Sequence, residues 1–210
     1  MRFKNVYFIN GNAYAGKSTM INMLSKKYNG ILCEENYHNA YLDELDSKEY
    51  PALTYTRDLK DFRDFIRRTP DEYEKWIKDV TKECEKLELK ILENIVKDDK
   101  LVFVDTNISI ETLKKISDKD HVLIMLADPD ISVNRFFDRP DREKQYLYRL
   151  MLEEENPEFA LNNFRECLKR INTKEIYDEF LHSGFNVLIR DDNRKVEETL
   201  HEVEKLFKLK

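Results

Sequence analysis

The stretch Gly11-Asn12-Ala13-Tyr14-Ala15-Gly16-Lys17-Ser18-Thr19 decides the fold of this 210-residue chain. It fits the pattern G-x-x-x-x-G-K-[ST], in which the glycines let successive backbone amides point inward at phosphate oxygens. In that pattern Lys17 reaches the β- and γ-phosphates of a nucleotide, and the Ser18 hydroxyl binds Mg²⁺. The stretch therefore predicts a phosphate-binding loop.

The segments on either side of the loop have the character that the pattern requires. Residues 3–9 form a short apolar run that predicts a strand ending at about Asn10. After the loop, apolar residues recur at helical spacing as far as Tyr28, and Asn29-Gly30 is a typical helix stop. Strand, loop and helix favour a phosphate site over a glycine-containing turn with an incidental Lys-Ser pair.

The rest of the chain alternates short apolar runs with amphipathic segments. Further strands are predicted at 30–35, 101–105, 121–127 and 185–190, and helices at 70–96, 141–155, 157–182 and from 196 onward. This alternation predicts an α/β fold of three layers, with a five-stranded parallel sheet between helices. We expect one domain over residues 1–210, with a helical insertion at 36–97.

Composition excludes several classes of protein. The net charge of −6 argues against a general nucleic-acid binder. Three cysteines far apart, with no C-x-x-C, favour neither a disulfide framework nor a zinc site. No signal segment and no apolar run of membrane-spanning length stands out, so we expect a cytoplasmic protein with no membrane partner.

Carboxylates follow two of the predicted strands. Ligands of open parallel sheets bind outside the carboxyl ends of the strands, where Glu34-Glu35 and Asp105 fall. Adjacent strand residues face opposite ways, so one of the two glutamates is expected to act on an acceptor hydroxyl or a metal, unless both are surface charges. An apolar run ending in aspartate also predicts that Asp105 binds Ser18 or a metal-bound water.

Two segments are rich in arginine. Arg57, Arg63, Arg67 and Arg68 are interleaved with aromatic residues, which would suit an anionic or ring-bearing acceptor. An amphipathic helix with a solvated face is the simpler interpretation of any one of them.

The second arginine-rich segment follows the fourth strand. Residues 133–156 contain Arg135, Arg139 and Arg142, and their place in the chain favours a lid that brings arginine to a transferring phosphate. The alternative is a linker between helices with surface ion pairs.

The chain resembles the nucleoside monophosphate kinase and shikimate kinase-like group of the P-loop NTPase superfamily. The resemblance depends on the loop, the strand ending at Asp105, the segment 135–142 and the strand-turn-helix from Val187 to Leu200. It implies a sheet order of 2-3-1-4-5, acceptor binding within residues 36–97 and a lid at 133–156. It also implies an adenine contact at the turn Asp191 to Asn193, so Asp192 is expected to bind nucleotide.

Because the chain departs from that group at two places, the substrate of neither shikimate kinases nor deoxynucleoside kinases can be assigned to it. Shikimate kinases carry D-x-D after the second strand, where this chain has Glu34-Glu35. Deoxynucleoside kinases carry an E-R-S-like segment after the third strand, where this chain has Asp105-Thr106-Asn107.

The expected activity is transfer of the γ-phosphoryl group of ATP, with Mg²⁺, to a nucleoside, a nucleotide or another small hydroxyl compound. The expected catalytic residues are Lys17, Glu35, Asp105, Arg139 and Arg142, with Ser18 and Asp105 at the metal and Arg135 at the nucleotide. The main alternative is an NTP-binding regulator or hydrolase without a small acceptor, although no N-K-x-D for guanine is present. A related protein that has lost catalysis is a third reading.

Overall fold

The computed structural model describes residues 3–96, 99–138 and 142–209 of the chain. These residues divide into two compact units. The first unit comprises Met1–Ala40, Cys84–Ala127 and Tyr177–Lys210, and the second comprises Tyr41–Glu83 and Asp128–Ile176.

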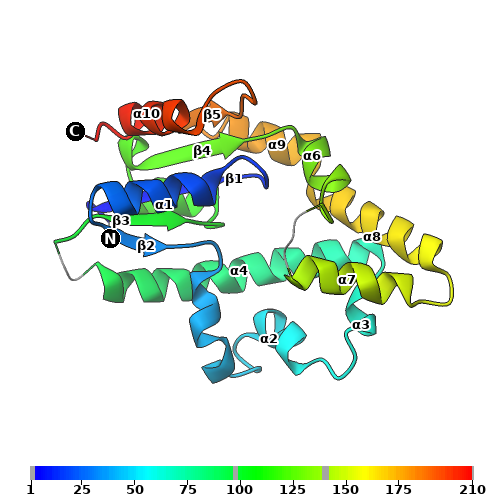
Figure 1. The fold of residues 1–210 in the computed structure, drawn as a ribbon. Helices are drawn as coiled ribbons and strands as arrows, with labels where there is room; N and C mark the ends of the chain where they lie inside the picture. The colour runs from blue at the N-terminus through cyan, green and yellow to red at the C-terminus, as the bar shows by residue number, and fades with distance from the viewer. Residues whose placement is uncertain (1–2, 97–98, 139–141, 210) are drawn as a thin grey trace. The chain divides into compact units, whose positions relative to one another are not determined.

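The first unit is built on a parallel sheet. Its strands are β1 (Val6–Gly11), β2 (Ile31–Cys33), β3 (Val102–Asp105), β4 (Val122–Leu126) and β5 (Asn186–Ile189). The described residues pair in the order β2-β3-β1-β4-β5, and each pairing is parallel (Figure 1). The predicted α/β class, parallel sheet and strand order are therefore confirmed. The register sets Ile9 beside Asp105 and Gly11 beside Met125, at the carboxyl ends of the central strands.

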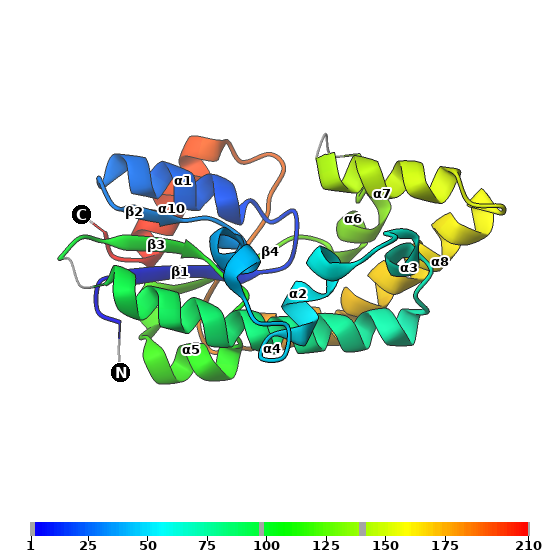
Figure 2. The same ribbon diagram turned by 90° about the horizontal axis from the view of Figure 1, so that it is seen from below.

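Helices cover both faces of this sheet (Figure 2). On one face lie α1 (Lys17–Lys27) and α10 (Val196–Leu206), which bury Ile21, Leu24 and Val203 in one apolar cluster. The other face is covered by α5 (Ile110–Ile116), α9 (Lys174–Leu181) and the C-terminal part of α4 (Pro70–Ile95), and a short helix, η2 (Lys119–His121), precedes β4. Two covered faces explain why β1, β3 and β4 are almost continuously apolar.

The second unit is helical. Besides the N-terminal part of α4, its elements are the end of η1 (Tyr37–Glu44), α2 (Pro51–Asp58), α3 (Arg63–Ile66), α6 (Pro129–Asn134), α7 (Arg142–Leu152) and α8 (Pro157–Ile171). Its core is rich in aromatic rings, with Phe65, Tyr73 and Phe164 buried together.

Capping explains where the long helix α4 begins. The Thr69 amide and hydroxyl both donate to the Glu72 carboxylate, and the Glu72 amide donates to the Thr69 hydroxyl, with Pro70 as the first helical residue. The predicted helix at 70–96 is confirmed. The single helix predicted at 157–182 is wrong, because α8 ends at Ile171 and α9 starts at Lys174. Asn172 leaves helical geometry, and the Thr173 hydroxyl accepts from the Ile176 amide at the start of α9.

Among the described residues, no helix combines the length and the apolarity needed to cross a bilayer. Cys33, Cys84 and Cys167 are buried, and none of the three forms a disulfide.

Candidate active site

The loop from Gly11 to Thr19 depends on two glycines in unusual backbone geometry. Gly11 has φ +129° and Gly16 has φ +93°, a region in which L side chains are strained. A Cβ atom on Gly11 would lie 1.9 Å from the Met125 carbonyl oxygen. Only glycine fits there, because β1 and β4 pass so close to each other at this point.

The same loop presents the amino end of α1. Gly16 is the N-cap of this helix, so its first amides have no intrahelical acceptor and form a positive helix end. Tyr14 also has positive φ, +66°, and its carbonyl oxygen accepts a 2.5 Å hydrogen bond from Nη1 of Arg190. Helix amides and a stiff, strained loop are suited to an anionic ligand.

Two asparagines hold the loop to its neighbours. The buried Asn10 side chain donates to the Ile108 carbonyl at 2.7 Å and accepts from the Gly11 amide at 2.6 Å. The Asn12 side chain donates to the Ala127 carbonyl and accepts from the Ala127 amide, at 2.6 and 2.7 Å. The residues that follow β3 and β4 are thereby fixed to the start of the phosphate-binding loop. Sequence reasoning missed Asn10, whose partner lies 98 residues away.

Lys17, Ser18 and Asp105 come together at the end of β3. The Ser18 hydroxyl donates to Oδ2 of Asp105 at 2.7 Å, and Nζ of Lys17 lies 3.9 Å from Oδ1. Lys17 also donates to the Asn12 carbonyl at 3.2 Å. Both charged side chains are buried, with 8% of Lys17 and 1% of Asp105 exposed. The predicted contact between Ser18 and Asp105 is present.

Asp105 is held in a surrounding that opposes its charge. Burial raises the pKa of Asp105 above its ordinary value, while Lys17 and the Ser18 hydrogen bond act in the opposite direction. The negative charges of Glu35 and Glu88 raise this pKa further. Its Oδ1 atom is buried and accepts no hydrogen bond within residues 3–96, 99–138 and 142–209. A bound cation would stabilise the charged form of Asp105 and would give Oδ1 a partner.

A second buried carboxylate, that of Glu88, acts on Asp105 through its charge and was not predicted. Glu88, 1% exposed, pairs with Nδ1 of His38 at 2.8 Å and accepts from the Thr106 hydroxyl at 3.2 Å. That hydroxyl in turn accepts from the Ile108 amide at 3.0 Å. The signal was available in the sequence, because Glu88 interrupts the apolar stripe of its helix between Cys84 and Leu92.

The two glutamates after β2 differ in their surroundings. Glu34 accepts a 2.9 Å hydrogen bond from the side chain of Asn22. Glu35 is exposed, and its charge acts on Asp105. Glu35 is therefore the better candidate for a carboxylate at this site.

The turn after β5 lies against the loop. Arg190, whose guanidinium bonds the Tyr14 carbonyl, also pairs with Asp192 at 2.7 Å. The predicted nucleotide residue Asp192 thus belongs to the surroundings of the loop.

The predicted lid arginines belong to the second unit. Arg135 and Arg142 are exposed at the end of α6 and the start of α7, and Arg139 lies outside the described residues. Arg135 and Arg142 belong to a different unit from Lys17 and Asp105, so the role of the lid arginines stays a prediction.

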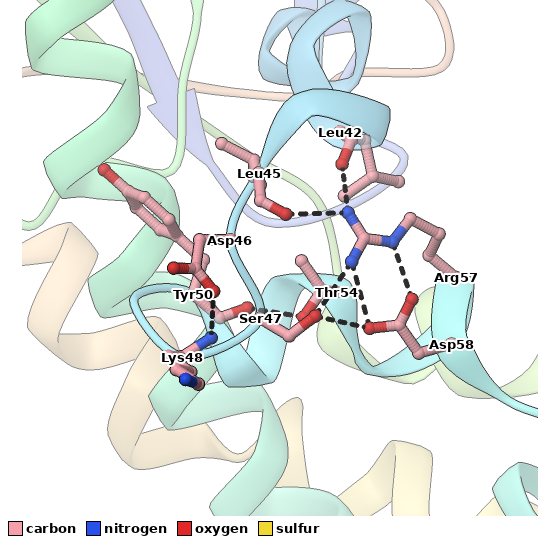
Figure 3. Close-up of polar contacts among 9 residues, drawn as sticks. All are labelled: Leu42, Leu45, Asp46, Ser47, Lys48, Tyr50, Thr54, Arg57 and Asp58. Carbon is pink, nitrogen blue, oxygen red and sulfur yellow. Dashed lines mark hydrogen bonds and ion pairs between the residues drawn. The ribbon is translucent and has the colours of Figure 1, made fainter.

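Three of the four acceptor-side arginines bond within the second unit. Arg57 donates to the Leu42 and Leu45 carbonyls at 2.7 and 3.0 Å and pairs with Asp58 at 2.7 Å (Figure 3). Arg63 pairs with Glu153, and Arg67 pairs with Glu154. These contacts fit the structural interpretation of the three side chains. Arg68 is the exception.

A comparison with models of known protein families finds none that matches the chain, and a comparison with curated proteins finds no match either.

Proposed function

We propose that the chain is a magnesium-dependent kinase of the P-loop type, which transfers the γ-phosphoryl group of ATP to a small acceptor. The observation that carries the proposal is the meeting of Lys17, Ser18 and Asp105 beside the free amino end of α1. A positive helix end, a buried ammonium group, a hydroxyl and an ionisable carboxyl are the groups that phosphoryl transfer from a nucleotide requires.

The residues present fit a magnesium ion. Mg²⁺ prefers oxygen ligands, and Ser18 and Asp105 offer a hydroxyl and a carboxylate that already contact each other. Oδ1 of Asp105 accepts no hydrogen bond from any described residue, and a cation or a metal-bound water would satisfy it. When bound, the ion would neutralise charge on the phosphate oxygens.

The chain's own residues would supply the remaining stabilisation. Lys17 is held by the Asn12 carbonyl and by Asp105, so its charge is fixed in position before any phosphate arrives. Glu35 would orient an acceptor hydroxyl and take its proton. Positioning and electrostatics are the main contributions, because phosphoryl transfer needs little covalent chemistry from the protein.

The experiment is ATP turnover by the purified chain with millimolar Mg²⁺, with and without a panel of nucleosides, nucleotides and small alcohols. We expect turnover that depends on one acceptor class. Lys17→Ala should lower it by about 100-fold or more while the folded state persists. Lys26→Ala is the matched control, since Lys26 is exposed in the last turn of the same helix.

Each other outcome has a defined meaning. Hydrolysis without an acceptor would favour an NTP hydrolase, and binding without turnover would favour a protein that has lost catalysis. The proposal fails if calorimetry detects no binding of a purine nucleotide with Mg²⁺, or if Lys17→Ala works as well as the parent.

A further inference from the structure

A cavity of about 860 Å³ lies wholly within the second unit. It is formed by α2, by the end of α3 with the two residues after it, and by the first half of α4. Pro51, Tyr55 and Trp76 provide apolar surface in its wall. Four acidic and four basic side chains also line it, so their formal charges cancel. A wall of this kind does not suit a polyanion such as a nucleoside triphosphate.

Most of the charged groups in this wall already have partners. The Glu83 carboxylate accepts from the Ala52 and Leu53 amides at the start of α2, with distances of 2.9 to 3.2 Å. Lys75 pairs with Asp79 at 2.9 Å. These groups serve the folded unit and are not free for a ligand.

Two further charged groups of the wall are also held by contacts within the second unit. Glu72 accepts from the Thr69 amide and hydroxyl in the cap of α4. Arg67 pairs with Glu154 through two hydrogen bonds of 2.9 and 3.1 Å.

Arg68 is different from its neighbours. Its guanidinium carbon lies 3.9 Å from the ring centre of Tyr55 and 5.1 Å from that of Trp76, so aromatic faces hold the group in place. Its Nη1 atom is buried and has no hydrogen-bond partner among the residues that the structure describes. No carboxylate in the described part of the chain forms an ion pair with it. Its charge acts on the Glu72 carboxylate, but that group already accepts from the Thr69 amide and hydroxyl in the cap of α4. Among the described residues no carboxylate is hydrogen-bonded to the Arg68 guanidinium, which leaves a donor unsatisfied, and an oxyanion would accept from it.

We propose that this cavity binds a small organic oxyanion, with Arg68 as its anchor. The chemical class is a carboxylate or a phosphate monoester attached to a flat apolar body. The oxyanion would accept from the guanidinium edge, while the apolar body would lie on Trp76 and Pro51. The inference does not rest on the proposed phosphoryl transfer, because the observations that support it all concern residues of the second unit.

The chain carries its own reporter for this site. Trp76 is its single tryptophan, and its indole Nε1 donates to the Ala52 carbonyl at 3.1 Å in the cavity wall. Tryptophan emission from the full chain can therefore be followed while benzoate, phenyl phosphate or neutral benzamide is added. We expect a saturable change with benzoate or phenyl phosphate, at a Kd on the order of 1 mM, and a much weaker one with benzamide. The two anions distinguish a carboxylate from a phosphate ligand.

Two variants assign the binding to Arg68. Arg68→Gln should weaken anion binding by about tenfold or more, because it removes the charge and the guanidinium fork. Arg67→Gln should change binding by less than about twofold, since that neighbour is already paired with Glu154. If Arg68→Gln fails to fold by circular dichroism, Arg68→Lys decides, and it should bind several-fold more weakly than the parent.

Three results would overturn the proposal. The first is no saturable response of the parent protein to either anion at tens of millimolar. The second is equal binding of benzamide and benzoate. The third is unchanged anion affinity in a folded Arg68 variant.

Discussion

The Ser18 hydroxyl donates a 2.7 Å hydrogen bond to Oδ2 of Asp105, while Oδ1 of the same carboxyl group is buried with no hydrogen-bond partner in the described part of the chain. The two residues are 87 positions apart, and the parallel pairing of β1 with β3 brings them together. One oxygen is satisfied and the other is not, so the charge on this carboxyl group is only partly compensated. The free energy of unfolding should therefore depend on pH through the titration of Asp105.

Asp105→Asn is expected to change stability in a pH-dependent way. Burial raises the pKa of Asp105, so the folded chain holds this proton more tightly than the unfolded chain does. The parent protein therefore loses stability as the pH rises from the ordinary aspartate pKa through the raised one, and asparagine does not titrate. The free energy of unfolding of the variant minus that of the parent should be larger at about pH 7 than at about pH 4. Urea unfolding at several pH values measures this difference, and a flat profile would contradict it.

Two glycine substitutions should differ in cost. Gly11→Ala places a Cβ 1.9 Å from the Met125 carbonyl oxygen in addition to its strained φ, so we expect a loss of about 3 kcal/mol or more, or no folding. Gly184→Ala has φ +85° but no atom within 4 Å of the new carbon, so only the backbone cost of about 1–2 kcal/mol remains. Denaturant midpoints of both variants test the ranking. Equal losses would show that steric contact at Gly11 is relieved.

Removal of the buried carboxylate of Glu88 should destabilise the first unit. Glu88→Ala deprives His38 Nδ1 and the Thr106 hydroxyl of their acceptor, and each buried group left without a partner costs about 1–3 kcal/mol. We expect a loss of about 3 kcal/mol in the free energy of unfolding. Glu93→Ala is the control, because Glu93 is exposed on the same helix and should change stability by less than about 0.5 kcal/mol. Similar values for both variants would refute the role given to Glu88.

Loss of Arg57 should loosen the segment between η1 and α2. Its guanidinium bonds the Leu42 carbonyl at the end of η1 and the Leu45 carbonyl just after it (Figure 3). In Arg57→Ala, amides of residues 42–50 should exchange hydrogen with solvent faster, while the sheet strands keep their rates. Lys60→Ala, an exposed change just after α2, should leave all rates as they are. Unchanged exchange at 42–50 would mean that the segment is held by other contacts.

Local patterns in the sequence predicted the parts of this fold that depend on local rules. The apolar runs gave the central strands because both sheet faces are covered, and Thr69-Pro70-Asp71-Glu72 predicted the start of α4. The break at Asn172-Thr173 was missed because apolar residues continue at helical spacing through it. The strand order came from the resemblance to a known family, since no local pattern specifies which strands are neighbours.

The candidate site also combines contacts that local sequence patterns predict with contacts that they do not. The contact between Ser18 and Asp105 was predictable because each residue stands at a fixed place in a sequence pattern. Asn10 and Glu88 were not, because their partners are distant in the chain and become visible only when the sheet is assembled. Arg68 could not be separated from the other three arginines by sequence, because the difference is whether a carboxylate of the folded unit forms an ion pair with the guanidinium.

Each unit contains a buried cysteine whose labelling rate reports how often its surroundings open. Burial, with a smaller contribution from the charge of Glu88, raises the pKa of Cys33 to about 12, and burial raises that of Cys167 to about 11. Both thiols are therefore slow to react until their surroundings open. Cys33 belongs to the first unit and Cys167 to the second. Chains that keep one of these cysteines would report, by their rate of thiol labelling, whether the two halves of the protein open as one or separately.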